Sequence, residues 1–317
     1  MVLAWGLGRG RVAVLNGFGI SLGDSIIGLQ ALDAALELEA VRGRPTLFRR
    51  TDTKPIVTAL YGLAGHFAEV LPMPEDTAAL ERFTHVVDIR DFAFDPGFRG
   101  VAMLDYFLGH LGLMPAAVPG RLRRNRWLGP SVVPRRPPGL PERYVLFCPR
   151  ASMALRDMPE AIQAAILDWL LVRTGFAVVT QGPVFCPNPR AIGIPDCTSI
   201  QELCGLVAGA EAVLSTDTAM VHLADAFSVP CLAFFVTHRP EWRVRDYPLC
   251  TPVHLPARLP EALEFARGPT DLSAARAAWF ARGTDLRWLP PLLDELAAPM
   301  LEAARAQSRL ALRPPHP

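Results

Sequence analysis

Lysine is almost missing from this chain of 317 residues. Lys54 is the single lysine, although lysine and arginine together number 32. A net charge is almost missing too, because 31 acidic residues leave a formal charge of +1 at pH 7. Without a global field of one sign, the charge balance does not favour nucleic acid or an acidic polymer as a partner. We therefore expect no nucleic-acid partner.

Paired cysteine motifs, long apolar runs and a signal-peptide pattern are also missing. No C-x-x-C motif occurs among the six cysteines, several of which stand inside apolar runs, so they predict buried thiols in a reducing compartment. No run of about 18 residues is free of charges and chain breakers, which argues against a membrane span. Arg9 and Arg11 interrupt any signal-peptide pattern at the N-terminus. Together these absences predict a cytoplasmic protein.

Apolar residues make up 50% of the chain and charged residues 20%, which is a globular composition, and the length allows two domains. The first half alternates strand and helix patterns. Strands are predicted at residues 11–17, 46–50 and 84–91, and helices at residues 25–41, 56–63 and 101–113. Residues 114–142 then lose periodicity and are crowded with proline and arginine, which is typical of a semi-rigid linker with a solvated surface.

The second half repeats the alternation more clearly. Strands are predicted at residues 144–149, 176–182, 211–215 and 231–236, and helices at residues 159–175 and 199–208. Four strands with helices between them predict a parallel, Rossmann-like sheet. An alanine- and leucine-rich helical tail follows. The predicted organisation is an N-terminal domain at 1–125, a linker at 126–142, a C-terminal domain at 143–272 and the tail at 273–317.

A hydroxyl-rich, acidic turn of Thr216, Asp217 and Thr218 follows the third of these strands, where parallel sheets place their ligands. Asp217 or Thr216 is predicted to cap the next helix, whose first N–H groups and dipole suit a phosphate. His222 lies four residues after Thr218 and shares its helix face. The alternative is a turn that only caps a helix. No metal is expected, because Asp217 and His222 lack a third ligand at a recognisable spacing.

A second glycine-rich turn, residues 17–24, opens the first helix. Its G-x-G-x-x-x-G spacing differs from the dinucleotide fingerprint, and Arg49 and Arg50 stand where an acidic residue would bind ribose. Because those arginines suit a 2′-phosphate, an NADP oxidoreductase stays an alternative. Asp24 can project a carboxylate toward a cleft, or it can merely cap the helix. In the second half, Arg156 follows a strand and can clamp a diphosphate, or it can be a solvated loop arginine.

Taken together, these motifs resemble glycosyltransferase family 9, the heptosyltransferases of the lipopolysaccharide core. The family's early G-D element is similar to Gly23-Asp24, and its K-x-W-P element is similar to residues 156–159. Its D-T-G-x-x-H-L-A-A signature is similar to residues 217–225. The sequence departs from the family at Arg156, where lysine is usual, and at Ala219, where glycine is usual. It also lacks an acidic residue after Gln181-Gly182, where family members often hold the nucleoside.

The resemblance implies an α/β GT-B fold, in which two Rossmann-like domains with parallel sheets face a central cleft. It implies inverting, metal-independent transfer of a heptose-like sugar from a nucleotide-diphosphate donor to a cell-envelope glycan or lipopolysaccharide-type acceptor. The nucleotide sugar is then a substrate, and no cofactor is expected. Asp24 is implied as the catalytic base. The implied donor diphosphate contacts are Arg156, Thr216, Asp217, Thr218, Ala219 and His222, and Gln181 and Gly182 are the candidates for nucleoside binding.

Two further possibilities stay open beside the NADP oxidoreductase. A catalytically degenerate family member would bind a nucleotide or a glycan without transferring a sugar. Peripheral contact with the inner face of the cytoplasmic membrane, through the arginine-rich linker or the C-terminal helix, is a second open possibility for a protein that acts on the cell envelope.

Overall fold

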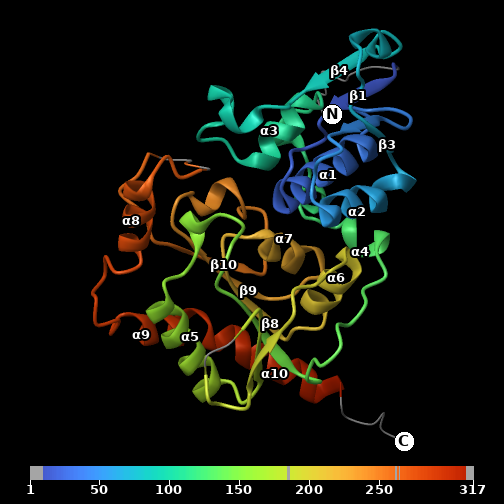
Figure 1. Ribbon diagram of the computed structural model, residues 1–317. Helices are drawn as coiled ribbons and strands as arrows, with labels where there is room; N and C mark the ends of the chain where they lie inside the picture. The colour runs from blue at the N-terminus through green and yellow to red at the C-terminus, as the bar shows by residue number, and fades with distance from the viewer. Residues whose placement is uncertain (1–9, 184–185, 261–262, 264, 312–317) are drawn as a thin grey trace, which may run out of the picture. The chain divides into compact units, whose positions relative to one another are not determined.

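The computed structural model describes residues 10–183, 186–260, 263 and 265–311 (Figure 1). Residues 1–9 of the predicted first domain and residues 312–317 of the predicted tail lie outside the described residues. Contacts between residues divide the chain into two compact units. The first unit comprises Met1–Val133, Thr198–Gln201 and Glu241–Tyr247, and the second comprises Pro134–Cys197, Glu202–Pro240 and Pro248–Pro317. The main division therefore falls inside the segment rich in proline and arginine.

The first unit is built on a four-stranded sheet in the order β3-β2-β1-β4, in which all neighbouring strands are parallel. Its strands are β1 (Val12–Leu15), β2 (Thr46–Arg49), β3 (Glu69–Pro72) and β4 (His85–Asp88). Its helices are α1 (Leu22–Glu37), α2 (Pro55–Leu63), α3 (Met103–His110) and the short α4 (Leu128–Ser131), and α1 contacts both α2 and α3. Every residue of β1 and β2 is buried, and β1 is apolar throughout, as is typical of a central parallel strand.

Close packing around α1 fixes the core of the first unit. The ring of Phe18, which is fully buried, meets Phe107 of α3 edge to face with 5.3 Å between the ring centroids. A methyl group at Gly28 of α1 would lie 2.0 Å from the Cβ of Phe18. A side chain at position 28 would therefore expel the aromatic ring from this contact.

The second unit is built on a six-stranded parallel sheet in the order β10-β9-β8-β5-β6-β7. Its strands are β5 (Tyr144–Cys148), β6 (Ala177–Gln181), β7 (Ala191–Ile194), β8 (Ala212–Thr216), β9 (Cys231–Phe235) and β10 (Cys250–His254). Its helices are α5 (Glu160–Arg173), α6 (Ile200–Ala208, whose first residues group with the first unit), α7 (Ala219–Ala226), α8 (Pro269–Ala278), α9 (Leu289–Leu296) and α10 (Ala298–Ala311).

The C-terminal helices complete the core of the second unit. Trp279, which directly follows α8, is fully buried and stacks obliquely on Phe234 of β9 with ring centroids 5.6 Å apart. Leu289 and Leu293 of α9 are fully buried in the same cluster as β5, β8 and α5. The helical tail is therefore an integral part of this unit.

The predicted strands all form, and the structure adds three that the sequence analysis missed. The second sheet has six strands, so the prediction of four was too low. The missed strands β3, β7 and β10 are edge strands, and they contain Pro72, Gly193 and Pro252 respectively. Proline and glycine are tolerated at sheet edges, where one side of the strand pairs with no neighbour. Their presence weakened the strand signal in these three segments.

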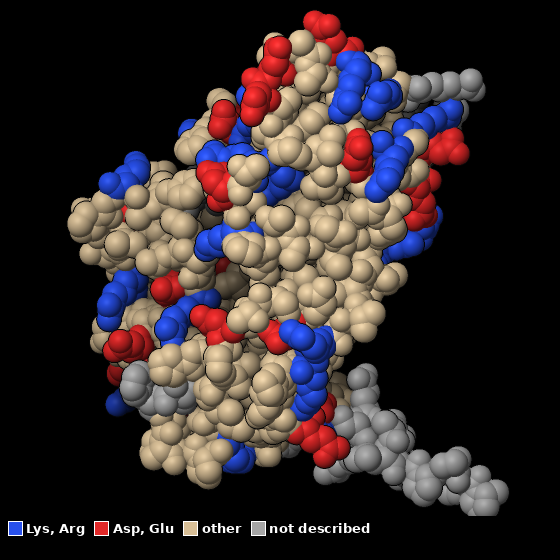
Figure 2. Space-filling model, turned by 45° about the vertical axis from the view of Figure 1, so that its right-hand side comes forward, with Lys and Arg blue, Asp and Glu red and all other residues tan. Residues whose placement is uncertain are grey.

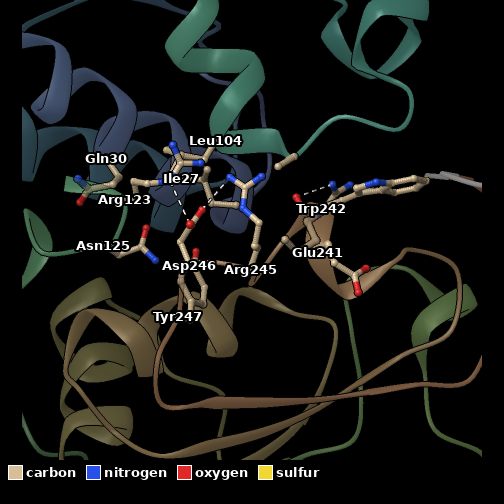
Figure 3. A pocket seen from close by; sticks show the side chains of 12 residues that line it. Ile27, Gln30, Leu104, Arg123, Asn125, Glu241, Trp242, Arg245, Asp246 and Tyr247 are labelled. Atoms are coloured by element: carbon tan, nitrogen blue, oxygen red, sulfur yellow. Dashed lines mark hydrogen bonds and ion pairs between the residues drawn. The ribbon is translucent and has the colours of Figure 1, made fainter. Parts of the chain in front are cut away.

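The segment Glu241–Tyr247 follows β9 in sequence but groups with the first unit. Arg123 and Arg245 both point toward Asp246 in Figure 3, with nitrogen–oxygen distances of 3.0 Å for each pair. Both arginines also bind Asp105 of α3. The side chain of Arg123 is 10% exposed, so the prediction that the arginines of this stretch are solvated is wrong for Arg123. These ion pairs attach the segment to α3.

Charges on the surface are mixed in sign. On the face shown in Figure 2, basic and acidic side chains are interspersed, in keeping with the net charge of +1. Among the described residues, no helix is long and apolar enough to cross a membrane. All six cysteines are free, and Cys148, Cys204 and Cys231 are buried.

Candidate functional site

Thr218 is the N-cap of α7. Its backbone is extended, with φ −141° and ψ 173°, and its hydroxyl accepts a hydrogen bond of 3.1 Å from the N–H of Met220. The prediction that Thr216 or Asp217 caps this helix is therefore wrong. All three residues have side chains that can cap, and the backbone leaves β8 one residue later than the sequence pattern indicates. Thr218 is half-buried, and so are Ala219 and Met220, the first two residues of the helix.

Thr216 connects two loops. Its side chain is fully buried, and its hydroxyl donates to the main-chain oxygen of Arg156. The hydroxyl therefore holds the loop after β5 against the end of β8. Because the Thr216 hydroxyl already forms this bond, Thr216 contributes to the site by fixing the position of Arg156.

Asp217 is a buried carboxylate between two basic side chains. It is 3% exposed, and its Oδ2 lies 3.5 Å from Nη1 of Arg156 and 3.3 Å from Nδ1 of His238. A buried carboxylate is costly unless it is paired, so the two partners account for its place in the interior. Asp217 fixes the orientation of Arg156 and His238 and is shielded from solvent.

His238 belongs to the site, although the sequence analysis did not place it. It is 1% exposed, and its Nδ1 also lies 3.1 Å from the hydroxyl of Thr237. His238 comes just after β9, as Asp217 comes just after β8, and these two strands are neighbours in the sheet. The pairing of Asp217 with His238 depends on β8 and β9 being neighbours, and the sequence analysis did not predict the order of the strands.

Arg156 ends a short 3-10 turn, Ala154–Arg156, which lies against α8. Its side chain is 18% exposed, and Nη2 lies 3.4 Å from the hydroxyl of Ser152. A guanidinium held by Asp217 on one side and reaching solvent on another has the geometry of an anion clamp. His222 of α7 is 4% exposed and sits one turn into the helix, so it lies in the interior.

A cavity of about 670 Å³ opens at the carboxyl ends of β5 and β6. Gln181, which was predicted to bind the nucleoside, lines it together with Thr180, Arg150, Asp157, Glu160, Gln163 of α5 and Arg276 of α8. The Oγ1 atom of Thr180 is buried and bonds to none of the described residues. Gly182 stands beside this cavity with φ +87°, and a methyl group on it would lie 3.2 Å from Nη2 of Arg150. The cavity has the size of a small-molecule site.

In the first unit, Asp24 is not the cap of α1. Ser21 is the N-cap, and its hydroxyl accepts a hydrogen bond of 3.2 Å from the N–H of Asp24. The alternative that Asp24 merely caps the helix is therefore wrong. Asp24 stands in the first helical turn and is half-buried, and a negative charge is favourable at that end of the helix dipole.

The alternative of an NADP enzyme loses its structural basis. Arg49 is 6% exposed, and its Nη1 donates to the main-chain oxygens of Asn16 and Gly19. Arg50 is exposed and pairs with Asp52. Neither guanidinium is therefore presented to a 2′-phosphate as that alternative requires.

Several solved structures of glycosyltransferases are similar to this chain. The dodecameric, iron-containing heptosyltransferase TibC in complex with ADP-D-β-D-heptose matches with a TM-score of 0.60 at 14% identity, covering 93% of this chain and 78% of its own. ADP-heptose LPS heptosyltransferase II of E. coli matches with a TM-score of 0.53 at 14% identity, covering 86% and 99%. The family 9 glycosyltransferase of Veillonella parvula matches with a TM-score of 0.52 at 12% identity, covering 79% and 87%.

These similarities, with the two parallel sheets, show that the fold is GT-B. Residues 190–248, which contain the Asp217 turn and His238, match the model of glycosyltransferase family 9 (heptosyltransferase). The resemblance to family 9 is thereby confirmed over residues 190–248. No curated protein matches the chain.

Proposed function

We propose that this protein is a glycosyltransferase that transfers a sugar, with inversion at the anomeric carbon, from a nucleotide-diphosphate donor to a cell-envelope glycan. The observation that carries the proposal is the Arg156–Asp217–His238 cluster at the start of α7, on the same edge of the sheet as the cavity beside β6. The TibC structure contains ADP-heptose, which makes a heptose on ADP the first donor to test.

The diphosphate binds at the start of α7 in this proposal. The half-buried residues Thr218 and Ala219 present the helix end, and Arg156 supplies a full positive charge held in place by Asp217. Thr216 and Asp217 support the guanidinium from the interior. His222 lies in the first turns of the same helix and supports the helix end from within. Such fixed charge stabilises a departing diphosphate by about several kcal/mol.

The nucleoside occupies the cavity next to Gln181 and Gly182. The buried hydroxyl of Thr180 and the amide of Gln181 offer hydrogen bonds to a base or a ribose. No acidic residue follows Gly182 directly, but Glu160 and Asp157 line the same cavity from the side of α5. One of these carboxylates takes the place of the acidic residue that the family holds elsewhere.

Asp24 acts as the general base in this mechanism. The acceptor hydroxyl oxygen attacks the anomeric carbon from the face opposite the diphosphate, and its proton passes to the carboxylate of Asp24. The bond from the anomeric carbon to the phosphate oxygen breaks, and its electron pair leaves with the diphosphate. A positioned base contributes about 10²–10⁴-fold to such a reaction. The positive charge at the leaving group comes from Arg156 and the helix end, so the mechanism operates without a metal.

A second candidate is a protein that binds a nucleotide or a glycan without transferring sugar. Ala219 favours it, because its methyl group stands on the first residue of α7, where a phosphate would approach the backbone. The capping role of Thr218 favours it as well. The Thr218 hydroxyl already accepts a hydrogen bond from the N–H of Met220, so it has less capacity to bind a phosphate oxygen.

The test is a screen of nucleotide sugars with mass-spectrometric detection of released nucleoside diphosphate, using ADP-heptose first and delipidated lipopolysaccharide core fragments as acceptors. Calorimetric titration with ADP, UDP and GDP runs in parallel. Release that depends on acceptor, with an inverted product by NMR, supports transfer. Tight binding of a nucleotide without turnover of any donor supports the second candidate, and binding of neither a nucleotide nor a core fragment refutes both.

The proposed setting is the cytoplasm, with peripheral contact to the inner leaflet through the arginine-rich segment 126–142 or the C-terminal helix. Co-sedimentation with vesicles of phosphatidylglycerol and phosphatidylethanolamine tests that contact. If the attachment is electrostatic, the protein should pellet with the vesicles at low salt and stay in the supernatant in 0.5 M salt. The reason is that salt screens the attraction between charges beyond about 10 Å or less.

A further inference from the structure

The loop between β1 and α1 has an unusual backbone. Asn16, Gly17 and Gly19 have φ of 60°, 52° and 93°, so three of four successive residues lie in the left-handed region. For Asn16 this conformation costs free energy, and it persists only where the surroundings hold it. The loop leads directly into the first turn of α1, which carries Asp24.

Two side chains from other elements hold this loop. Arg49, the last residue of β2, donates from Nη1 to the main-chain oxygens of Asn16 (2.7 Å) and Gly19. The hydroxyl of Tyr61, on α2, accepts a hydrogen bond of 2.9 Å from the N–H of Phe18. The two side chains also contact each other, because the guanidinium carbon of Arg49 lies 4.0 Å from the centroid of the Tyr61 ring. Three positions of the loop are thus bonded to one arginine–tyrosine pair.

Arg49 has no acidic partner among the residues that the structure describes. It is 6% exposed, and its Nε and Nη2 atoms are buried and bond to none of those residues. Elsewhere in the chain the same edge of an arginine binds a carboxylate, as Arg50 binds Asp52. Burial of a cation without an ion pair lowers the free energy of unfolding. Among the described residues, the hydrogen bonds of the Arg49 side chain go to this loop alone, which indicates that the side chain serves the loop.

Gly19 connects the loop to Asp24. A methyl group at Gly19 would lie 3.6 Å from the Cβ of Asp24 and 2.8 Å from the ring of Phe92. The residue whose carbonyl Arg49 holds therefore lies against the side chain of Asp24. Arg49 and Tyr61 together form a clamp on the loop, and Gly17 packs directly against this Arg49–Tyr61 clamp. A methyl group at Gly17 would lie 2.9 Å from the Tyr61 hydroxyl and 3.0 Å from Cδ of Arg49.

We propose that Arg49, supported by Tyr61, is a positioning residue that fixes the carboxylate of Asp24 through the Asn16–Gly19 loop. The proposal rests on the proposed function, in which Asp24 is the base. Displacement of a reacting group by about 1 Å costs about 10²-fold in rate. Arg49 reaches the loop with two hydrogen bonds from one nitrogen and stacks on Tyr61, and a lysine ammonium in its place reproduces the charge without this planar fit.

The test compares Arg49→Lys with its neighbour Arg50→Lys as a matched control. Hydrogen exchange is followed by mass spectrometry in peptides covering residues 12–25 and, as an internal reference, residues 212–226. We expect R49K to raise exchange at residues 16–24 and to leave the reference peptide unchanged. With the donor and acceptor found in the screen, we expect kcat to fall about 10–100-fold while the KM for the donor stays within twofold. R50K is expected to match the wild type in both measurements.

Tyr61→Phe is the second variant and carries the test if R49K does not fold. It removes the hydroxyl that binds Phe18 but keeps the ring beneath Arg49. We expect it to lower kcat less than R49K and to raise exchange in the same peptide. Unchanged exchange at residues 16–24 in the folded variants overturns the inference, and so does a donor KM that rises as much as kcat falls. Raised exchange together with a fully active Asp24→Asn variant would instead overturn the role of Asp24 and leave the clamp standing.

Discussion

The two turns that carry the candidate site differ in where they place their aspartate. In the first unit Asp24 stands three residues after the N-cap Ser21, inside the first turn of α1. In the second unit Asp217 stands one residue before the N-cap Thr218, outside α7. Asp24 is half-buried, whereas Asp217 is 3% exposed and paired with Arg156 and His238. The same motif of strand, turn and helix thus gives one aspartate that is partly accessible to solvent, Asp24, and one that is a buried framework residue, Asp217, whose ion pairs hold its neighbours in place.

The two turns are also held in different ways. The Asp217 turn is fixed by charge, through a carboxylate with two basic partners. The loop before Asp24 is fixed by Arg49 and Tyr61, which bind its main-chain groups. Charge pairing suits a turn that must hold a cation beside an anionic ligand. Clamping through main-chain groups suits a loop whose left-handed backbone must be kept in place.

The largest expected effect comes from Asp24→Asn. The amide keeps the shape of the side chain but cannot accept the proton, so transfer should fall about 10²–10⁴-fold. The donor binds in the second unit in our proposal, so its Kd should stay within twofold. Rate measurement with the identified donor and calorimetry with the nucleotide check this. A variant that transfers sugar at the wild-type rate would refute Asp24 as the base and end the contrast between the two aspartates.

Asp217→Asn is expected to act on stability and on donor binding together. It leaves the buried His238 and the partly exposed Arg156 without their carboxylate, and loss of one partner of a buried pair costs about 3 kcal/mol or more. Thermal unfolding and nucleotide titration measure the two effects. Asp24→Asn is the matched control, because its half-buried carboxylate should cost little stability. If D217N melts like the wild type, Asp217 is not the framework residue described above.

Sequence reasoning located both turns and their aspartates but not the contacts that hold the turns in place. The runs that became β1 and β5 are apolar and buried throughout, so apolar composition alone identified them. Asp217 and Arg156 were recognised from their places after strands, yet their pairing depends on β5 and β8 being neighbours.

The remaining errors have the same origin in long-range structure. His238 was missed because β9 lies beside β8, which no local pattern reveals. The sequence pattern offered Arg49, with Arg50, for a 2′-phosphate, whereas the acceptors of Arg49 are main-chain oxygens 30 and 33 residues away. A local pattern carries no signal for a side chain that bonds to distant main chain, so sequence alone could not separate Arg49 from its neighbour Arg50.

Substitution of Arg156 tests the charged character of the second turn. Arg156→Ala should weaken nucleotide-diphosphate binding about 10-fold or more, since a charge-assisted hydrogen bond contributes about 1.5–3 kcal/mol. Arg156→Lys restores the residue that the family usually has at this place and should recover most of that loss. Titration with the diphosphate and with the corresponding nucleoside separates phosphate binding from base binding. Equal losses for both ligands would contradict a clamp on the phosphates.

The smallest effects come from the two caps, and they compare the turns on equal terms. Ser21→Ala and Thr218→Ala each remove one side-chain acceptor from a helix N–H, at 3.2 Å from Asp24 and 3.1 Å from Met220. Each should cost about 1 kcal/mol of stability, measured by chemical denaturation.

The effects of the two cap substitutions on function should diverge. S21A should lower the transfer rate without changing donor affinity, because the Asp24 N–H loses its acceptor while the Arg49 clamp remains. T218A should weaken donor binding, because the helix end that receives the phosphates loses its cap. The same loss of donor affinity in both variants would show that the two turns do not divide the work between base and donor.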